Sequence, residues 1–324
     1  MRKPVPDLAV EIRSRRMLLL AGWTERSVQR AVRAGRMHVI RRGWYIDAEE
    51  WASLWPEERH RAHVIAVVRD AWTAAPVCRT SAAVLWDLPL YRVQPRSVHL
   101  LCGPERRNSS GDDVTRHIEP YGPLDVEVID GIPCTSLSRT VFDLIRTLPR
   151  EAAVAVADAA ERQMALRGRE WDLDAVESWR LGMAQRIAEH PGARGIRQAR
   201  WVSEFADGRA QLPGESVSRL QLHRLGFAPP RLQVEIAGPQ GRPYFVDFGM
   251  DDVRFFGEFD GETKYRDAAM RQGRSLEDVL IEEKRREDWI RGRTRWGLVR
   301  WGSAHIRTSR SLGARLAEFS VRAP

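Results

Sequence analysis

Two carboxylates stand among aromatic residues in the stretch FFGEFDGETKY, residues 255–265. Glu258 and Asp260 are two residues apart on a predicted strand and therefore share a face, and Lys264 follows four residues after Asp260. A carboxylate among Phe, Val and Tyr is costly to bury unless it is paired or binds a metal. Two interpretations are open. One is a metal site that cuts phosphodiesters, and the other is a strand that ends in an Asp-Gly turn with ordinary surface charges.

The segments around this stretch predict the elements that would position it. LPGESVSRLQLHRLGF predicts a helix that ends at Gly226, and PPRLQVEIAG, RPYFVDFGM and VRFFGEFDG predict three antiparallel strands. SLEDVLIEEKRREDW predicts a further helix with a capping-box-like start, and WGLVRWGS predicts a last strand. Helix, three strands, helix and strand is the order of the restriction-endonuclease-like fold.

The strand register decides how close the acids lie. A turn at Asp251-Asp252 places Asp247 nearly opposite Phe256, with Glu258 as its diagonal neighbour, roughly 7–8 Å away between Cα atoms. Two carboxylates at that separation can share one hard cation such as Mg²⁺ (or Mn²⁺).

Four motifs in residues 212–303 resemble the Vsr-like branch of the PD-(D/E)XK nucleases: PGESVSRL, YFVDFGM, EFDGETKY and EEKRREDWIRGRTRWGLVRW. The resemblance implies metal-assisted hydrolysis of DNA, with Asp247 and Glu258 as metal ligands and Glu215 as the acid of the first helix. The family places a lysine two residues after the third-strand acid, and this chain has Asp260 there.

This departure leaves two alternatives. In one, Asp260 adds a ligand or helps to position the water, Lys264 replaces the missing ammonium, and the chain is a metal-dependent deoxyribonuclease. In the other, the site binds metal or DNA without cutting. The helical residues Lys284, Arg285 and Arg286 either grip the DNA backbone or form a solvated face with ion pairs such as Glu282–Arg286.

The other end of the chain is basic. Residues 1–45 contain 11 basic and 3 acidic residues, and their excess of +8 equals the formal net charge of all 324 residues. A basic end on an otherwise neutral chain indicates a polyanionic partner bound there.

The basic end predicts a winged helix-turn-helix. A first helix is expected from about Asp7 to Leu20, and Thr24 is a good N-cap for a second helix that ends near Gly35. The segment HVIRRGWYI then alternates as a β-hairpin with Arg-Arg-Gly at its tip.

The basic side chains of this segment predict the DNA contacts. Arg26, Arg30 and Arg33 form one outward stripe of the second helix, since they are spaced i, i+4 and i+7. We expect Arg26 and Arg30 to read bases of double-stranded DNA and Arg33, Arg41 and Arg42 to contact phosphates. The alternative is a small helical cap with solvated arginines. The segment LLLAGWTERSVQRAVRAGRMHVIRRGWYI also resembles the N-terminal domain of AbiEi-type antitoxins, which implies an autorepressor whose partner is a nucleotidyltransferase-like toxin.

The predicted fold class is α+β and multidomain. We expect a winged helix in residues 1–50, an AbiEi-like α/β scaffold in 51–165, a helical connector in 166–205 and the nuclease-like mixed sheet with flanking helices in 206–324. In the scaffold, Ser81, Arg139 and Asp143 are interpreted first as capping and ion-pairing residues, and second as contacts to a partner or nucleic acid.

Composition excludes several classes of protein. A charged content of 30% and the absence of a long apolar run argue against a membrane protein. Three widely spaced cysteines indicate reduced thiols in the cytosol, and the HxxH at His60 and His63 has no cysteine-rich neighbourhood to complete a metal site. Two functions remain: a nuclease directed to DNA by a winged helix, and a non-catalytic antitoxin-type repressor with an inactive nuclease fold.

Overall fold

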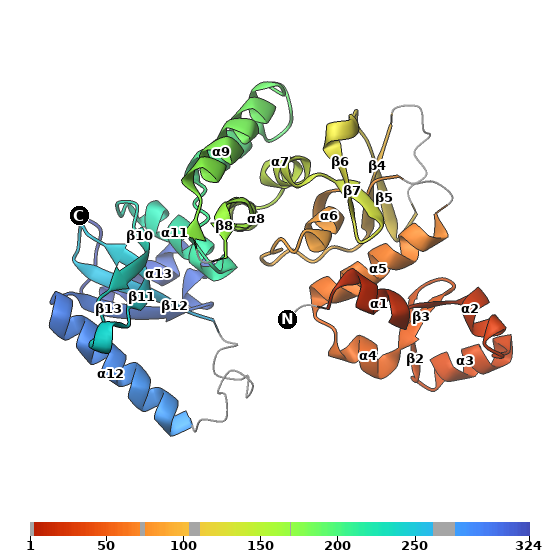
Figure 1. Ribbon diagram of the computed structural model, residues 1–324, viewed down its shortest axis with the longest axis horizontal. Coiled ribbons are helices and arrows are strands. Elements are labelled where there is room, and N and C mark those ends of the chain that lie inside the picture. The colour runs from red at the N-terminus through yellow and green to blue at the C-terminus, as the bar shows by residue number, and fades with distance from the viewer. Residues whose placement is uncertain (1–2, 72–74, 104–110, 169, 262–275) are drawn as a thin grey trace. The chain divides into compact units, whose positions relative to one another are not determined.

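The computed structural model describes residues 3–71, 75–103, 111–168, 170–261 and 276–324 (Figure 1). It is a mixed helical and β structure with several small sheets. The chain divides into two compact units. Unit 1 comprises Met1–Leu148 and Arg180–Ser203, and unit 2 comprises Pro149–Trp179 and Glu204–Pro324. The four predicted domains stay a prediction.

Unit 1 begins with three helices and a small sheet. The elements are α1 (Val5–Glu11), β1 (Arg13–Ser14), α2 (Arg15–Leu20), α3 (Glu25–Arg33), β2 (Met37–Arg41) and β3 (Trp44–Asp47). The strands pair antiparallel in the order β1-β3-β2.

The predicted single helix from Asp7 to Leu20 is wrong. The chain becomes extended at the buried Ile12, and β1 then pairs with β3. Ser14 restarts the helix because its hydroxyl accepts the Met17 amide at 3.1 Å. This N-cap was visible in the sequence and was missed.

The rest of unit 1 continues the same hydrophobic core. The elements are α4 (Ala48–Ser53), α5 (Pro56–Asp70), α6 (Arg79–Leu85), β4 (Val98–Cys102), β5 (Val114–Ile118), β6 (Val126–Ile129), β7 (Ile132–Thr135) and α7 (Leu137–Thr147). Buried residues of α1, β3, α5, α6, β4 and β7 form one cluster from Val5 to Cys134. Helix α1 therefore shares this core with later elements of unit 1.

Unit 2 contains a four-stranded sheet flanked by helices. Its elements are α8 (Arg150–Ala165), β8 (Leu166–Arg167), β9 (Glu170–Trp171), α11 (Pro213–Leu225), β10 (Arg231–Ile236), β11 (Tyr244–Met250), β12 (Phe255–Asp260), α12 (Leu276–Thr294), β13 (Gly297–Gly302) and α13 (Ser309–Ala317). The helices α9 (Leu173–Ala188) and α10 (Ile196–Phe205) contribute residues to both units.

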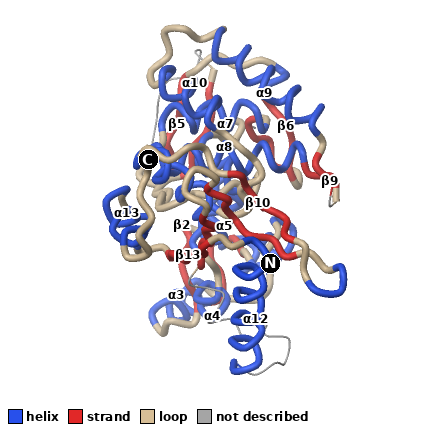
Figure 2. Tube along the Cα trace, turned by 90° about the vertical axis from the view of Figure 1, so that its left-hand side faces the viewer, coloured by secondary structure: helices blue, strands red, loops and turns tan. Residues whose placement is uncertain are grey.

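The order α11-β10-β11-β12-α12-β13 matches the predicted order of elements. The strands lie in the order β10-β11-β12-β13, antiparallel except for the parallel pair β12-β13. Figure 2 shows α12 as one uninterrupted helix, and its Ile290 packs in a core cluster with residues of all four strands.

The predicted register of β11 and β12 is wrong by two residues. Phe256 pairs with Gly249 and not with Asp247, because the turn between the strands has four residues, 251–254. Arg254 closes that turn with a φ of 55°. The ladder runs from Met250↔Phe255 to Phe248↔Gly257, so its next position sets Asp247 opposite Glu258.

Candidate functional site

The outer face of α3 is an exposed basic feature of unit 1. Thr24 caps this helix, with its hydroxyl accepting the Ser27 amide at 3.1 Å. Val28 and Ala31 are buried on the inner face. The arginines of the predicted stripe are all exposed and form no hydrogen bond or ion pair with the described residues: Arg26, Arg30 and Arg33. We call these three residues the α3 arginine stripe.

The hairpin after α3 carries the two arginines predicted to contact phosphates, Arg41 and Arg42, and the two differ in their surroundings. Gly43 turns the chain with a φ of 83°, and its carbonyl accepts the Arg15 amide at 2.8 Å, which ties the turn to the start of α2. Arg42 is exposed in the turn and has no polar partner among the described residues. Arg41 points elsewhere: it is ion-paired with Asp113 at 2.8 Å and Asp70 at 3.2 Å.

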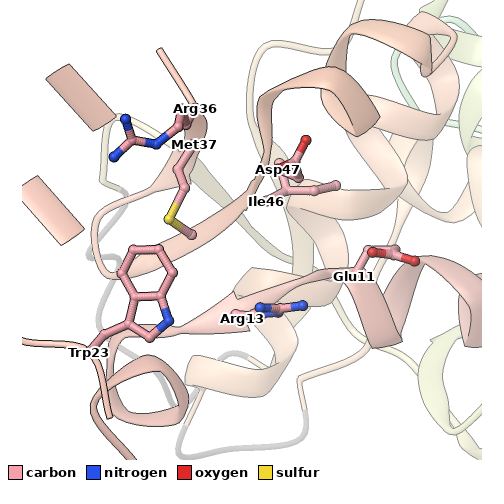
Figure 3. Close-up of a pocket in the computed structure, with 7 residues that line it drawn as sticks. All are labelled: Glu11, Arg13, Trp23, Arg36, Met37, Ile46 and Asp47. Atoms are coloured by element: carbon pink, nitrogen blue, oxygen red, sulfur yellow. The ribbon is translucent and has the colours of Figure 1, made fainter. Parts of the chain in front are cut away.

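A cavity of about 210 Å³ lies at the end of the β1-β3-β2 sheet (Figure 3). Its walls come from the end of α1, the three strands and the segments on either side of α3: Glu11, Arg13, Trp23, Arg36, Met37, Ile46 and Asp47. We call it the sheet-end cavity. It was not predicted, because its walls come from four stretches of the chain that only folding brings together.

In unit 2, Glu258 is held by two guanidinium groups. Its side chain is on β12, and the residue is only 8% exposed. Its Oε1 accepts a hydrogen bond from Arg286 Nη2 of α12 at 2.6 Å. Its Oε2 lies 3.0 Å from Arg300 Nε of β13, which is the register partner of Glu258. Both oxygens of this acid therefore face cations of the chain itself.

Arg300 also links Glu258 to two carboxylates of α12. Its Nη1 donates to Glu283 at 2.7 Å, and its Nη2 lies 4.0 Å from Glu287. Burial acts to lower the pKa of Arg300, but the carboxylates of Glu258 and Glu283 outweigh it and raise the pKa above its usual range. Arg300 is thus a permanent cation. It was not predicted, since nothing in the strand WGLVRW singles it out.

The other predicted acids also accept hydrogen bonds from the protein. The Phe259 amide donates to Asp247 Oδ2 at 2.7 Å, so this carboxylate replaces a backbone acceptor in the ladder. Glu215 is 3% exposed, and its Oε2 accepts the Gln211 amide at 2.9 Å and Gln233 Nε2 at 3.1 Å.

The remaining predicted residues of unit 2 are spread out. Asp260 is the last residue of β12 and is half-buried, and Lys264 lies outside the described residues. On α12, Lys284 and Arg285 are exposed with no polar partner among the described residues, whereas Arg286 turns inward to Glu258.

These donors do not fit a Mg²⁺ site as they are arranged. Within the part of the chain that the structure describes, His, Cys, Asp and Glu form no group of three that could hold a metal ion. A hard cation at Glu258 would have to displace two guanidiniums, and the Asp247 oxygen at 2.7 Å from Phe259 N is already an acceptor.

The predicted scaffold residues take structural positions in unit 1. Ser81 is fully buried, and its hydroxyl accepts the His99 amide and contacts His60 Nε2 at 2.8 Å. Arg139 is 5% exposed and pairs with Asp143 at 3.0 Å. His63 lies 3.5 Å from Asp113, and its ring centroid is 6.3 Å from that of His60. The three cysteines are buried and free.

Part of the chain is similar to proteins of Mycobacterium tuberculosis. No family model matches it. Two uncharacterized proteins from two strains of Mycobacterium tuberculosis, MT2308 and Rv2248, are each 30% identical over 171 residues, or 49% of this chain. The chain spans 59% of the length of these relatives.

A solved structure, titled as the crystal structure of the RV2827C protein from Mycobacterium tuberculosis, is similar with a TM-score of 0.35 and 13% identity. The match covers 74% of this chain and 91% of that chain. No described helix is both long and apolar enough to cross a membrane.

Proposed function

We propose that the chain is a transcriptional regulator that binds double-stranded DNA through α3 and the β2-β3 hairpin. The succession α1-β1-α2-α3-β2-β3 is the arrangement of a winged helix-turn-helix, in which α3 enters the major groove and the hairpin contacts the backbone. The observation that carries the proposal is the α3 arginine stripe: three exposed cations with no ion-pair partner among the described residues.

Several other arginines of unit 1 are already paired. Arg15, Arg41, Arg61, Arg79 and Arg139 all have carboxylate partners. A cation that is already paired gains less from a phosphate, because it must give up its partner. We therefore assign base reading to Arg26 and Arg30 and phosphate contacts to Arg33 and Arg42, and we do not assign Arg41 to the interface.

The test is DNA affinity over a range of salt concentrations for the double variant Arg33→Ala/Arg42→Ala, which removes both assigned phosphate contacts. We expect a loss of affinity and a smaller slope of log affinity against log salt, by about 0.9 for each lost phosphate contact. Arg200→Ala is the control, since this exposed arginine of α10 also has no polar partner among the described residues. If the double variant and the control have equal slopes of log affinity against log salt, the proposal is refuted.

The probe for this test is the DNA upstream of the chain's own gene, because the resemblance to AbiEi-type antitoxins implies autorepression. Genomic fragments enriched by the wild-type protein serve as a second probe. A nucleotidyltransferase-like toxin partner rests on that resemblance alone, and co-purification with the product of a neighbouring gene tests it.

A metal-dependent DNA nuclease is the second candidate. The order of elements in unit 2 favours it, together with the ladder position that sets Asp247 opposite Glu258. The guanidiniums at Glu258 argue against a metal site in this arrangement. Calorimetric titration of Mg²⁺ and Mn²⁺, beside a plasmid-nicking assay, separates the two functions. Binding and nicking that are both lost in Asp247→Ala would establish the nuclease, and no binding by the wild type would exclude it.

A further inference from the structure

The sheet-end cavity is lined by charges of both signs that the fold leaves unpaired. The side chains of Glu11, Arg13 and Arg36 form no hydrogen bond or ion pair with any described residue. Asp47 Oδ1 accepts the Glu49 amide at 2.9 Å as the N-cap of α4, and no described residue contacts its Oδ2. Two cations and two anions therefore line one cavity. A ligand with a single charge would be attracted and repelled in similar measure, whereas a zwitterion complements both signs.

The remaining walls are apolar. Trp23 and Met37 are half-buried, and Ile46 is buried. Figure 3 shows the Trp23 ring and the Met37 thioether on the same side of the cavity. Such a surface favours an aliphatic or aromatic group. A volume of about 210 Å³ lies below the ~300–1,000 Å³ typical of pockets for drug-sized molecules, so the occupant is small.

We propose that the sheet-end cavity binds a free α-amino acid with an apolar side chain. Its carboxylate is bound by Arg13, its ammonium by Glu11 and Asp47, and its side chain packs on Trp23, Met37 and Ile46. Neither charged end has to displace an existing ion pair, since the described residues leave these side chains without one.

The position of the cavity gives the ligand a means to act on α3. Trp23 precedes the first residue of α3 by two positions, and Met37 follows its last residue by four. A ligand that contacts both residues holds both ends of α3 against the β1-β3-β2 sheet. The bound amino acid already orders α3, so less conformational entropy is lost when DNA binds. The amino acid therefore raises the affinity for DNA. Only this coupling rests on the proposed function.

The first experiment is calorimetric titration of the full chain, without DNA, with L-leucine and L-phenylalanine. N-acetyl-L-phenylalanine lacks the ammonium, and L-phenylalanine amide lacks the carboxylate. We expect saturable binding of at least one free amino acid, and at least ~10-fold weaker binding of both single-charge analogues. Equal binding of the free amino acids and the analogues, or no binding at millimolar concentrations, would overturn the proposal.

Variants locate the site on the protein. Glu11→Gln and Arg13→Gln should each weaken amino-acid binding by at least ~10-fold, while Arg16→Gln, an exposed arginine of α2 outside the cavity, should leave it unchanged. Circular dichroism and the melting temperature show whether each variant is folded. Unchanged binding by both folded cavity variants would place the ligand elsewhere and refute the assignment.

DNA affinity at saturating amino acid then tests the coupling. We expect an increase of at least ~5-fold in the wild type and none in Arg13→Gln. If the chain binds the amino acid but not DNA, the amino-acid site is supported and the DNA-binding function is refuted. DNA binding that is unchanged by a bound amino acid would refute the coupling alone.

Discussion

Arg286 ties α12 to the sheet of unit 2, and its removal should loosen that helix. The guanidinium donates to Glu258 Oε1 at 2.6 Å and to the carbonyl of Phe245. Its side chain is 21% exposed and that of Glu258 is 10% exposed, so solvent screens the pair only in part. Ile290 is buried, whereas the other described side chains of α12 are half-buried or exposed. Polar contacts therefore contribute a large part of its attachment.

The size of the effect follows from these contacts. A hydrogen bond to a charged group contributes about 1.5–3 kcal/mol, and loss of one partner from a fully buried ion pair costs about 3–5 kcal/mol. Glu258 keeps Arg300 at 3.0 Å after the substitution, and the lost pair is partly solvated. We expect Arg286→Ala to lower the free energy of local opening of α12 by about 1–3 kcal/mol.

Hydrogen exchange read out by mass spectrometry measures this opening directly, because it resolves the amides of α12 from the rest of the chain. Arg285→Ala is the matched control, since this neighbouring arginine is exposed and has no polar partner among the described residues. Its effect should be within about 0.5 kcal/mol. Equal protection of α12 in the two variants would show that the pair at Glu258 does not hold the helix, and would refute the reasoning.

Three further predictions concern the two units. His99 Nδ1 lies 2.7 Å from His117 Nε2, and burial lowers the pKa of both residues to about 4. Because the unfolded chain binds protons first, near the ordinary pKa of 6.5, unit 1 should be fully stable above that pH. It should lose stability as the pH falls towards 4, and thermal melts of wild type and His117→Gln check this loss. Thr24→Ala removes the cap of α3 and should cost about 1 kcal/mol in urea unfolding, with weaker DNA binding; unchanged values of both would contradict the cap's role. Gly257→Ala places a Cβ 2.2 Å from the Trp301 ring and should destabilise unit 2 by about 1–3 kcal/mol, and unaltered calorimetric melting would refute this clash.

Local signals in the sequence predicted many elements correctly. Thr24 caps α3, Gly35 follows it with a φ of 67°, and Gly226 ends α11 with a φ of 91°. Alternating residues predicted the β2-β3 hairpin and the strands of unit 2. These features depend on neighbours within a few residues, where capping, turn chemistry and side-chain alternation act. The break at Ile12 was missed because the partner of β1 is more than 30 residues away.

The candidate sites were predictable only in part. The spacing of the α3 arginine stripe is a property of one helix, and the structure exposes all three residues as expected. The acids of unit 2 were identified by type, but their partners were not. Arg286 reaches Glu258 from 28 residues away, and Arg300 from the next strand. The four-residue turn at 251–254 set the register, and a shift of two residues keeps the side-chain face while changing every opposite neighbour.

By itself, the sequence determined many of the helices and strands, several of their caps, and that the positive charge gathers in the first 45 residues. The tertiary structure alone decided which charges are paired. Arg41 is bound by Asp70 and Asp113, whereas Arg42 beside it is exposed. Glu258 is enclosed by two guanidiniums, and four separate stretches of the chain meet around the sheet-end cavity. Local conformation depends on adjacent residues, but ion pairing and cavities depend on segments that only folding brings together.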